Sequence, residues 1–123
     1  MNIRTAVMAD ALYCVICGAL AGIFAMPLAG LTGLPIWSAY LAACGLIGWG
    51  VVLWWLTRRQ GARASARVAI IGNIVWLAGA ALAMVSGLFP APAMTLGLIV
   101  DMGVLLLLAW QLMARRANPQ PAQ

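Results

Sequence analysis

The sequence contains no lysine, no glutamate and no histidine, and only 7% of its 123 residues are charged. A soluble domain normally has charged residues at about a quarter of its positions, which keep its surface in water. Hydrophobic residues make up 66% of the chain, well above the roughly 45–50% of an ordinary globular domain. A water-facing fold is therefore excluded, and we expect one all-helical domain that lies in a membrane.

The missing residue types also exclude most site chemistry. Without histidine, glutamate or lysine, the two aspartates and three cysteines supply no spaced acid–base pair. The same inventory offers no ordinary ligand set for a metal ion or a haem. We therefore expect no catalytic residue, no metal site and no cofactor.

Two long stretches, 11–57 and 68–114, carry no charge except Asp101. Each is long enough for two crossings of about 20 residues, and each has a Gly/Pro-rich break, at 30–35 and 86–92. A four-helix transmembrane domain over 1–116, folded as an up-down bundle, is predicted, with a disordered cytoplasmic tail over 117–123. The four predicted helices lie near 7–29, 35–57, 67–88 and 92–114.

All seven arginines lie at the ends of the apolar stretches. Arg4 precedes the first predicted helix, and the other six are Arg58, Arg59, Arg63, Arg67, Arg115 and Arg116. By the positive-inside rule, both termini and the middle loop face the cytoplasm. We expect a multi-pass protein of the inner (plasma) membrane. The net charge of +5 reflects this orientation, so nucleic acid is not expected as a partner.

The two halves of the chain share a pattern when one is shifted by 57 residues. The matching positions are Leu20–Gly22 with Leu77–Gly79, Gly30-Leu31 with Gly87-Leu88, Pro35 with Pro92, and Arg58-Arg59 with Arg115-Arg116. Two helical hairpins that run in the same direction would form a parallel repeat. The alternative is that any such hairpin needs a Gly/Pro turn and a basic end.

Asp101 is the most informative candidate residue, because an ionisable side chain in a spanning helix is costly and points to function. It precedes Arg115 by fourteen residues, which places it roughly 21 Å above the cytoplasmic end, in the outer half of the membrane. One interpretation is a relay for a proton or a cation. The other is a protonated acid that joins helices by donating a hydrogen bond to a carbonyl, to Tyr40 or to another polar group.

Asn73 and Trp76 lie one turn apart and are predicted to form a polar patch for a ligand such as a quinone-like headgroup. A hydrogen bond to a neighbouring helix is the alternative for Asn73. Asn73 is expected to lie about 12 Å from Asp101 in height, too far for direct contact. Asp10 lies near Arg4, and a solvated cap of the first helix is expected there.

Cys14 and Cys17 form a C-x-x-C pattern like that of membrane thiol oxidoreductases that reduce quinone. Their expected position near the cytoplasmic end and the absence of a second pair favour plain packing. Small residues at four-residue spacing predict close helix contacts at Gly18, Gly22, Gly48 and Gly79. This spacing does not show which of these glycines contact helices of the same chain and which contact a partner protein.

Three functions remain open from the sequence. The first is an accessory or assembly subunit, or a self-associating bundle, whose partners are the lipid bilayer and a second copy or another membrane protein. The second is a small proton- or cation-coupled transporter or channel that uses Asp101. The third and least favoured is a thiol/quinone redox protein that uses Cys14 and Cys17.

Overall fold

The structure is a computed structural model that describes residues 2–117, and the described residues form helices with no strand. Four of the helices are long and apolar enough to cross a membrane, as the sequence predicts. The five helices are α1 (Ile3–Ile23), α2 (Ala25–Thr32), α3 (Ile36–Gln60), α4 (Ala62–Ser86) and α5 (Ala91–Ala117). The predicted tail begins within α5 at Ala117, and 118–123 lie outside the described residues.

The first predicted helix, 7–29, is split in the structure at Phe24 into α1 and α2. Pro27 explains the break, because a proline has no N–H and its ring collides with the carbonyl group four residues earlier, here that of Ile23. In the first turn of α2 the same proline is tolerated. The chain can therefore bend at Phe24 without losing the rest of either helix.

Local sequence signals fix the other helix ends. The Asn2 side chain accepts a hydrogen bond of 2.9 Å from the backbone N–H of Arg4 and caps α1. Gly33, Gly61 and Gly87 have positive φ angles where α2, α3 and α4 end. Only glycine adopts such angles without strain. Because Gly61 is the only residue between α3 and α4, the arginine-bearing segment is almost entirely helical.

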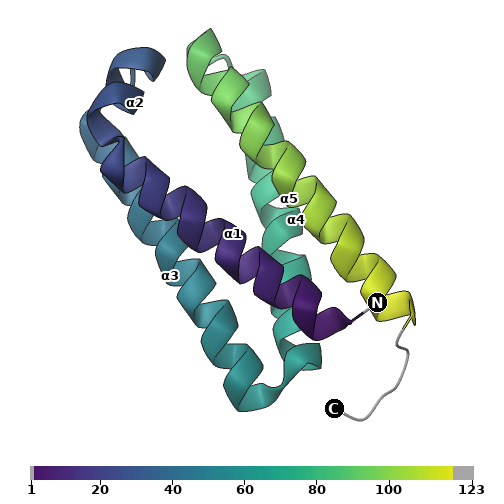
Figure 1. The fold of residues 1–123 in the computed structure, drawn as a ribbon. Helices are drawn as coiled ribbons and strands as arrows, with labels where there is room; N and C mark the ends of the chain where they lie inside the picture. Colours follow the sequence, from purple (N-terminus) through teal and green to yellow (C-terminus); the bar gives the residue numbers. More distant parts are fainter. Residues whose placement is uncertain (1, 118–123) are drawn as a thin grey trace.

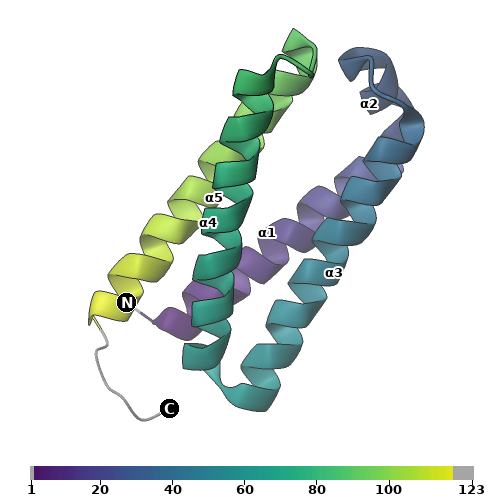
Figure 2. The ribbon, with the colours of Figure 1, turned by 180° about the vertical axis from the view of Figure 1, so that it is seen from behind.

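The helices form two hairpins, α1–α3 and α4–α5, shown from two sides in Figure 1 and Figure 2. The hairpins come together at the end that holds the N-terminus and the α3–α4 connection, here called the basic end. Their long helices diverge toward the opposite end, where α2 and the α4–α5 turn lie and where α2 still contacts α5. Helix α1 touches all four other helices and makes its most extensive contact with α3.

Helices α1 and α3 pack closely because glycines face the partner helix. A Cβ atom at Gly18 would lie 2.9 Å from the Ala43 carbonyl oxygen, and one at Gly50 would lie 2.7 Å from the Ala11 carbonyl oxygen. A Cβ atom at Gly22 would make ordinary contact, at 3.5 Å from Ala43 Cβ. The α1–α3 seam therefore depends on backbone-to-backbone approach.

A Cβ atom at Gly48 or at Gly79 would have no neighbour within 4 Å. These two glycines do not pack inside this chain, although their spacing resembles that of Gly18 and Gly22. The internal repeat stays a prediction, since Gly22 and Gly79, which the repeat pairs, differ in their surroundings.

Hydrogen bonds between hydroxyl groups and stacking of arginines on aromatic rings stabilise the basic end. The Thr57 hydroxyl group donates to the Leu53 carbonyl oxygen (2.7 Å) and shares a hydrogen bond of 2.8 Å with the Ser65 hydroxyl group, which ties α3 to α4 inside the protein. The guanidinium groups of Arg58 and Arg59 lie over the rings of Trp54 and Trp55, at 5.1 and 5.6 Å from the ring centroids. Such stacking keeps each charge at the level where an apolar span ends.

We expect Gly50→Ala to lower the free energy of unfolding by about 1–3 kcal/mol, because the new methyl group overpacks the α1–α3 seam. The matched change on the same helix, Gly48→Ala, enters open space and should raise it by roughly 0.5–1 kcal/mol through helix propensity. Unfolding in mixed micelles with increasing SDS measures both. Equal effects of the two changes would contradict the seam.

Candidate functional site

Asp10 lies at the centre of a buried polar cluster that joins α1, α4 and α5. Its Oδ2 atom accepts hydrogen bonds from Asn73 Nδ2 and from Gln111 Nε2, both at 2.8 Å. Asn73 Nδ2 also lies 3.1 Å from Gln111 Oε1, and Cys14 Sγ donates to Asp10 Oδ1 at 3.6 Å. These three donors are uncharged, so a carboxyl group is held in the bundle by neutral dipoles.

The expectation that Asp10 is a solvated cap is wrong. Asp10 is only 1% exposed, and Asn2 caps the helix instead. The helix begins at Ile3, which places Asp10 two turns inside it, on the face of α1 that meets α4 and α5. The closeness of Asp10 to Arg4 in the sequence suggested an interfacial position, but its side chain points into the bundle and is buried.

Asp101 forms a second polar contact, between α4 and α5. Its Oδ1 atom accepts a hydrogen bond of 2.8 Å from Trp76 Nε1. Asp101 is buried, as expected for an acid that faces the bundle interior, whereas Tyr40 is exposed on α3. The partner of the acid is therefore the indole of Trp76, and the acid accepts the hydrogen bond.

The two acids are linked through neighbouring positions on α4. Asn73, which donates to Asp10, and Trp76, which donates to Asp101, are one turn apart. On α5, Gln111 and Asp101 are ten residues apart, or about 15 Å along the helix. The polar groups therefore form two layers, one nearer the basic end and one farther from it. Asn73 bonds only within the first layer, in agreement with its expected separation from Asp101.

Tyr13 joins α1 to α5 beside the Asp101 layer. Its hydroxyl group donates to the Val100 carbonyl oxygen at 2.9 Å, beside Asp101 in the sequence. Gly103 makes this possible, because a Cβ atom there would collide with the Tyr13 hydroxyl. In the same way Gly72 on α4 leaves room for the indole of Trp49 from α3. Two glycines thus allow two aromatic side chains to bridge the hairpins.

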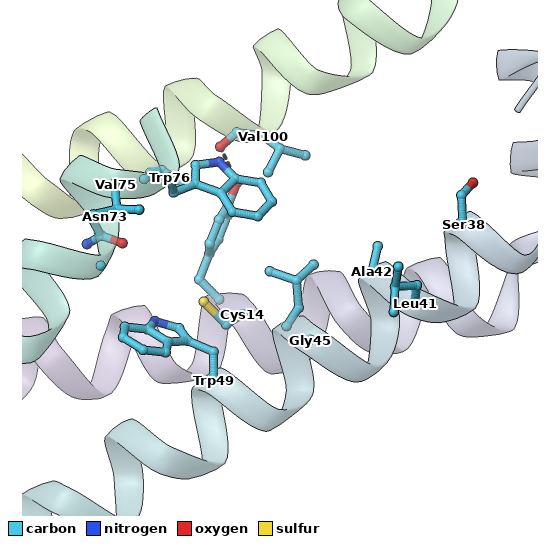
Figure 3. Close-up of a pocket in the computed structure, with 14 residues that line it drawn as sticks. Cys14, Ser38, Leu41, Ala42, Gly45, Trp49, Asn73, Val75, Trp76 and Val100 are labelled. Atoms are coloured by element: carbon cyan, nitrogen blue, oxygen red, sulfur yellow. Dashed lines mark hydrogen bonds between the residues drawn. The ribbon is translucent and has the colours of Figure 1, made fainter. Parts of the chain in front are cut away.

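A pocket of about 570 Å³ lies between the hairpins, where they diverge. Four long helices contribute to its wall, which is mostly apolar and aromatic and includes Tyr13, Cys14, Trp49, Asn73 and Trp76. Figure 3 shows Trp49 and Trp76 approaching from opposite sides, with Cys14 between them in this view. Its volume falls in the range of small-molecule sites, about 300–1,000 Å³.

The pocket and the acids share side chains. Asn73 and Trp76 line the pocket and also donate to Asp10 and Asp101, and Cys14 lines it and donates to Asp10. Each acid is therefore one side chain away from the cavity. A ligand that takes the hydrogen bond of Asn73 or Trp76 would therefore change the contacts of a carboxyl group.

The thiols occupy different environments. Cys14 is buried beside Asp10, Cys17 is half-buried and Cys44 is exposed, and all three are free. No group of three or more His, Cys, Asp or Glu side chains that could hold a metal ion occurs among residues 2–117. The chemistry of the site is thus that of two carboxyl groups and their hydrogen-bond donors.

Sequence reasoning identified Asp101, Asn73 and Trp76, but it missed Asp10 and Gln111. Gln111 carried a usable signal, since it is an amide inside an apolar span, four residues before Arg115. Such a side chain needs a partner in the membrane interior. Its pairing with Asp10, 101 positions away, required knowledge of which helices are neighbours.

Known proteins give no guide to this site. No family model, curated protein or solved structure matches the chain. What the site can do therefore follows from the acids, their donors and the pocket.

We expect Gln111→Leu to lower the free energy of unfolding by about 1–2 kcal/mol, because Asp10 and Asn73 each lose a buried partner. Thr95→Ala on the same helix is the control, since Thr95 is exposed and bonds only to the Ala91 carbonyl oxygen of its own helix. This control should change stability by less than about 0.5 kcal/mol. If the two variants unfold alike in SDS titration, the Asp10 cluster contributes no stability.

Proposed function

We propose that the protein is a small proton- or cation-coupled carrier that works through its two intramembrane acids. The observation that carries the proposal is the direct hydrogen bonding of pocket-lining side chains to Asp10 and Asp101. Acids inside spanning segments typically mark ion pathways and proton relays. The carrier has no covalent chemistry of its own.

The two layers give such a carrier two positions, at different depths, where a proton or a cation can bind. The Asp10 layer lies toward the basic end and the Asp101 layer lies farther from it, with the Tyr13 hydroxyl group bonded to the Val100 carbonyl oxygen beside the Asp101 layer. Neutral donors hold each acid, so a proton or cation that binds there meets no fixed positive charge on Asn73, Gln111 or Trp76. Binding at one layer can then be felt in the pocket through Asn73 or Trp76.

The proposed location is the inner (plasma) membrane with both termini in the cytoplasm. The support is the clustering of arginines at one end of the bundle, where Arg58 and Arg59 stack on tryptophan rings. Positively charged residues are enriched on the cytoplasmic side of membrane proteins. In this orientation the Asp10 layer is the cytoplasmic one.

A second candidate function is that of an accessory subunit or a self-associating bundle. It is favoured by Gly48 and Gly79, which have small-residue spacing but no neighbour within 4 Å in this chain. Such faces allow close approach of another helix. A thiol/quinone redox role through Cys14 and Cys17 has less support, because Cys14 is buried beside Asp10.

We expect the protein in sealed liposomes to carry protons down an imposed gradient, and we expect Asp101→Asn to reduce this flux to the level of protein-free liposomes. The asparagine keeps an oxygen that accepts from Trp76 but cannot ionise, so the fold should survive. A dye that reports internal pH measures the flux, and Thr95→Ala is the control. Flux through Asp101→Asn equal to that of the wild type would overturn the proposal.

Native mass spectrometry after gentle extraction separates the carrier from an accessory subunit. A carrier should leave the membrane as a monomer or a homo-oligomer. A constant second protein in the complex would support the accessory subunit instead. If Gly79 lies at a contact between copies, Gly79→Leu should convert the oligomer to monomer, whereas the same change should leave a monomeric carrier unaltered.

A further inference from the structure

We propose that the pocket between the hairpins binds a lipophilic organic cation, meaning a bulky apolar molecule with one delocalised or shielded positive charge. This substrate class rests on the proposed carrier function and specifies what is carried. Three features of the pocket select it: the apolar wall, the carboxyl groups behind that wall, and the opening toward lipid.

The wall of the pocket suits the apolar body of such a molecule. Its volume of about 570 Å³ accommodates a drug-sized molecule. On the α3 side the lining is formed by small or aliphatic residues, including Leu41, Ala42 and Gly45, with Trp49 at the end nearer the basic side. A strongly hydrated ion would lose its water there without replacement, whereas an apolar surface gains from burial.

The charge of the ligand follows from what stands behind the wall. Asp10 and Asp101 are each hydrogen-bonded to a lining residue, and both are buried. No arginine is among the residues that line the pocket. Electrostatic attraction acts strongly over such short separations in an apolar medium. In their ionised form the same two groups repel an anion.

Aromatic rings supply the direct contacts for the positive charge. Tyr13, Trp49 and Trp76 line the pocket from three different helices. The negative face of an aromatic ring attracts a cation, most strongly when both are out of water. Trp76 has a further role, because a cation close to Asp101 competes with the indole N–H for the carboxyl group. Because a proton also binds to Asp101 in the proposed carrier, substrate and proton compete for this carboxyl group.

Entry from the lipid follows from the exposure of the rim. Leu41 is 65%, Val75 64% and Trp76 44% exposed, and all three line the pocket. They belong to α3 and α4, which diverge away from the basic end. A lipophilic cation dissolves in a bilayer, so it can reach this opening sideways.

The test is equilibrium dialysis of the full-length protein in lipid nanodiscs against two ions of the same shape, tetraphenylphosphonium and tetraphenylborate. After subtraction of binding to empty nanodiscs, we expect the cation to bind about tenfold more tightly than the anion. Equal binding of the two ions, or tighter binding of the anion, would overturn the inference.

Two pocket-filling variants locate the binding. Gly45→Leu and Ala42→Phe place bulk in the pocket, and a Cβ atom at Gly45 meets no neighbour within 4 Å. Each should reduce cation binding about tenfold or more. Gly48→Leu, one turn nearer the basic end and outside the lining, should leave it unchanged. Cation binding that survives both filling variants in folded protein would place the ion elsewhere and refute the proposal.

The outcomes for substrate and function are distinguishable. Dialysis measures binding without any gradient, so it does not depend on proton flux. Proton flux that needs Asp101, combined with no preference for the cation, overturns the substrate class and leaves the carrier standing. Selective cation binding without any proton flux, in liposomes that also contain the cation, supports the pocket and overturns the carrier.

Discussion

The hydrogen bonds to Asp10 are the constraint on which the rest of the structure depends. In lipid, helices gain little from hydrophobic attraction, so packing and polar contacts must hold them together. Asn73 and Gln111 bring α4 and α5 to the same carboxyl oxygen on α1. This three-helix junction fixes the second hairpin against the first. The glycine-lined seam with α3 then fixes the remaining long helix to α1.

The pocket is a consequence of where that junction lies. Close to the basic end, the Asp10 cluster and the Thr57–Ser65 contact hold the hairpins together. Beyond the junction the long helices of the two hairpins diverge, and they are bridged by long side chains, such as Tyr13 to the Val100 carbonyl oxygen, and by the contact of α2 with α5. The space that remains is bounded by Trp49 and Trp76 rather than filled by them. A cavity beside two acids thus follows from the tilt of the helices.

Much of the fold could be predicted from the sequence, because apolar length and Gly/Pro breaks reflect local physics. The split at Phe24 was also accessible, since Pro27 forbids a continuous helix. The Asp10 cluster was not, because it joins residues 63 and 101 positions apart. The position of Asp101 inside a long apolar helix followed from the sequence, but its partner did not. Helix rotation and neighbourhood decide such pairs, and a single sequence carries no direct record of either.

The two acids differ in how far their hydrogen bonds offset the cost of placing them in the membrane. An aspartate at the centre of a spanning helix costs roughly 2.5–3.5 kcal/mol on insertion scales, and an interhelical hydrogen bond returns about 0.6 kcal/mol on average and at most about 1.7. Asp10, with three donors, can come close to balance. Asp101 accepts from Trp76 alone among the contacts described, so its structural return falls short of its cost. This imbalance supports a role for Asp101 in binding a proton or a cation rather than in holding helices together.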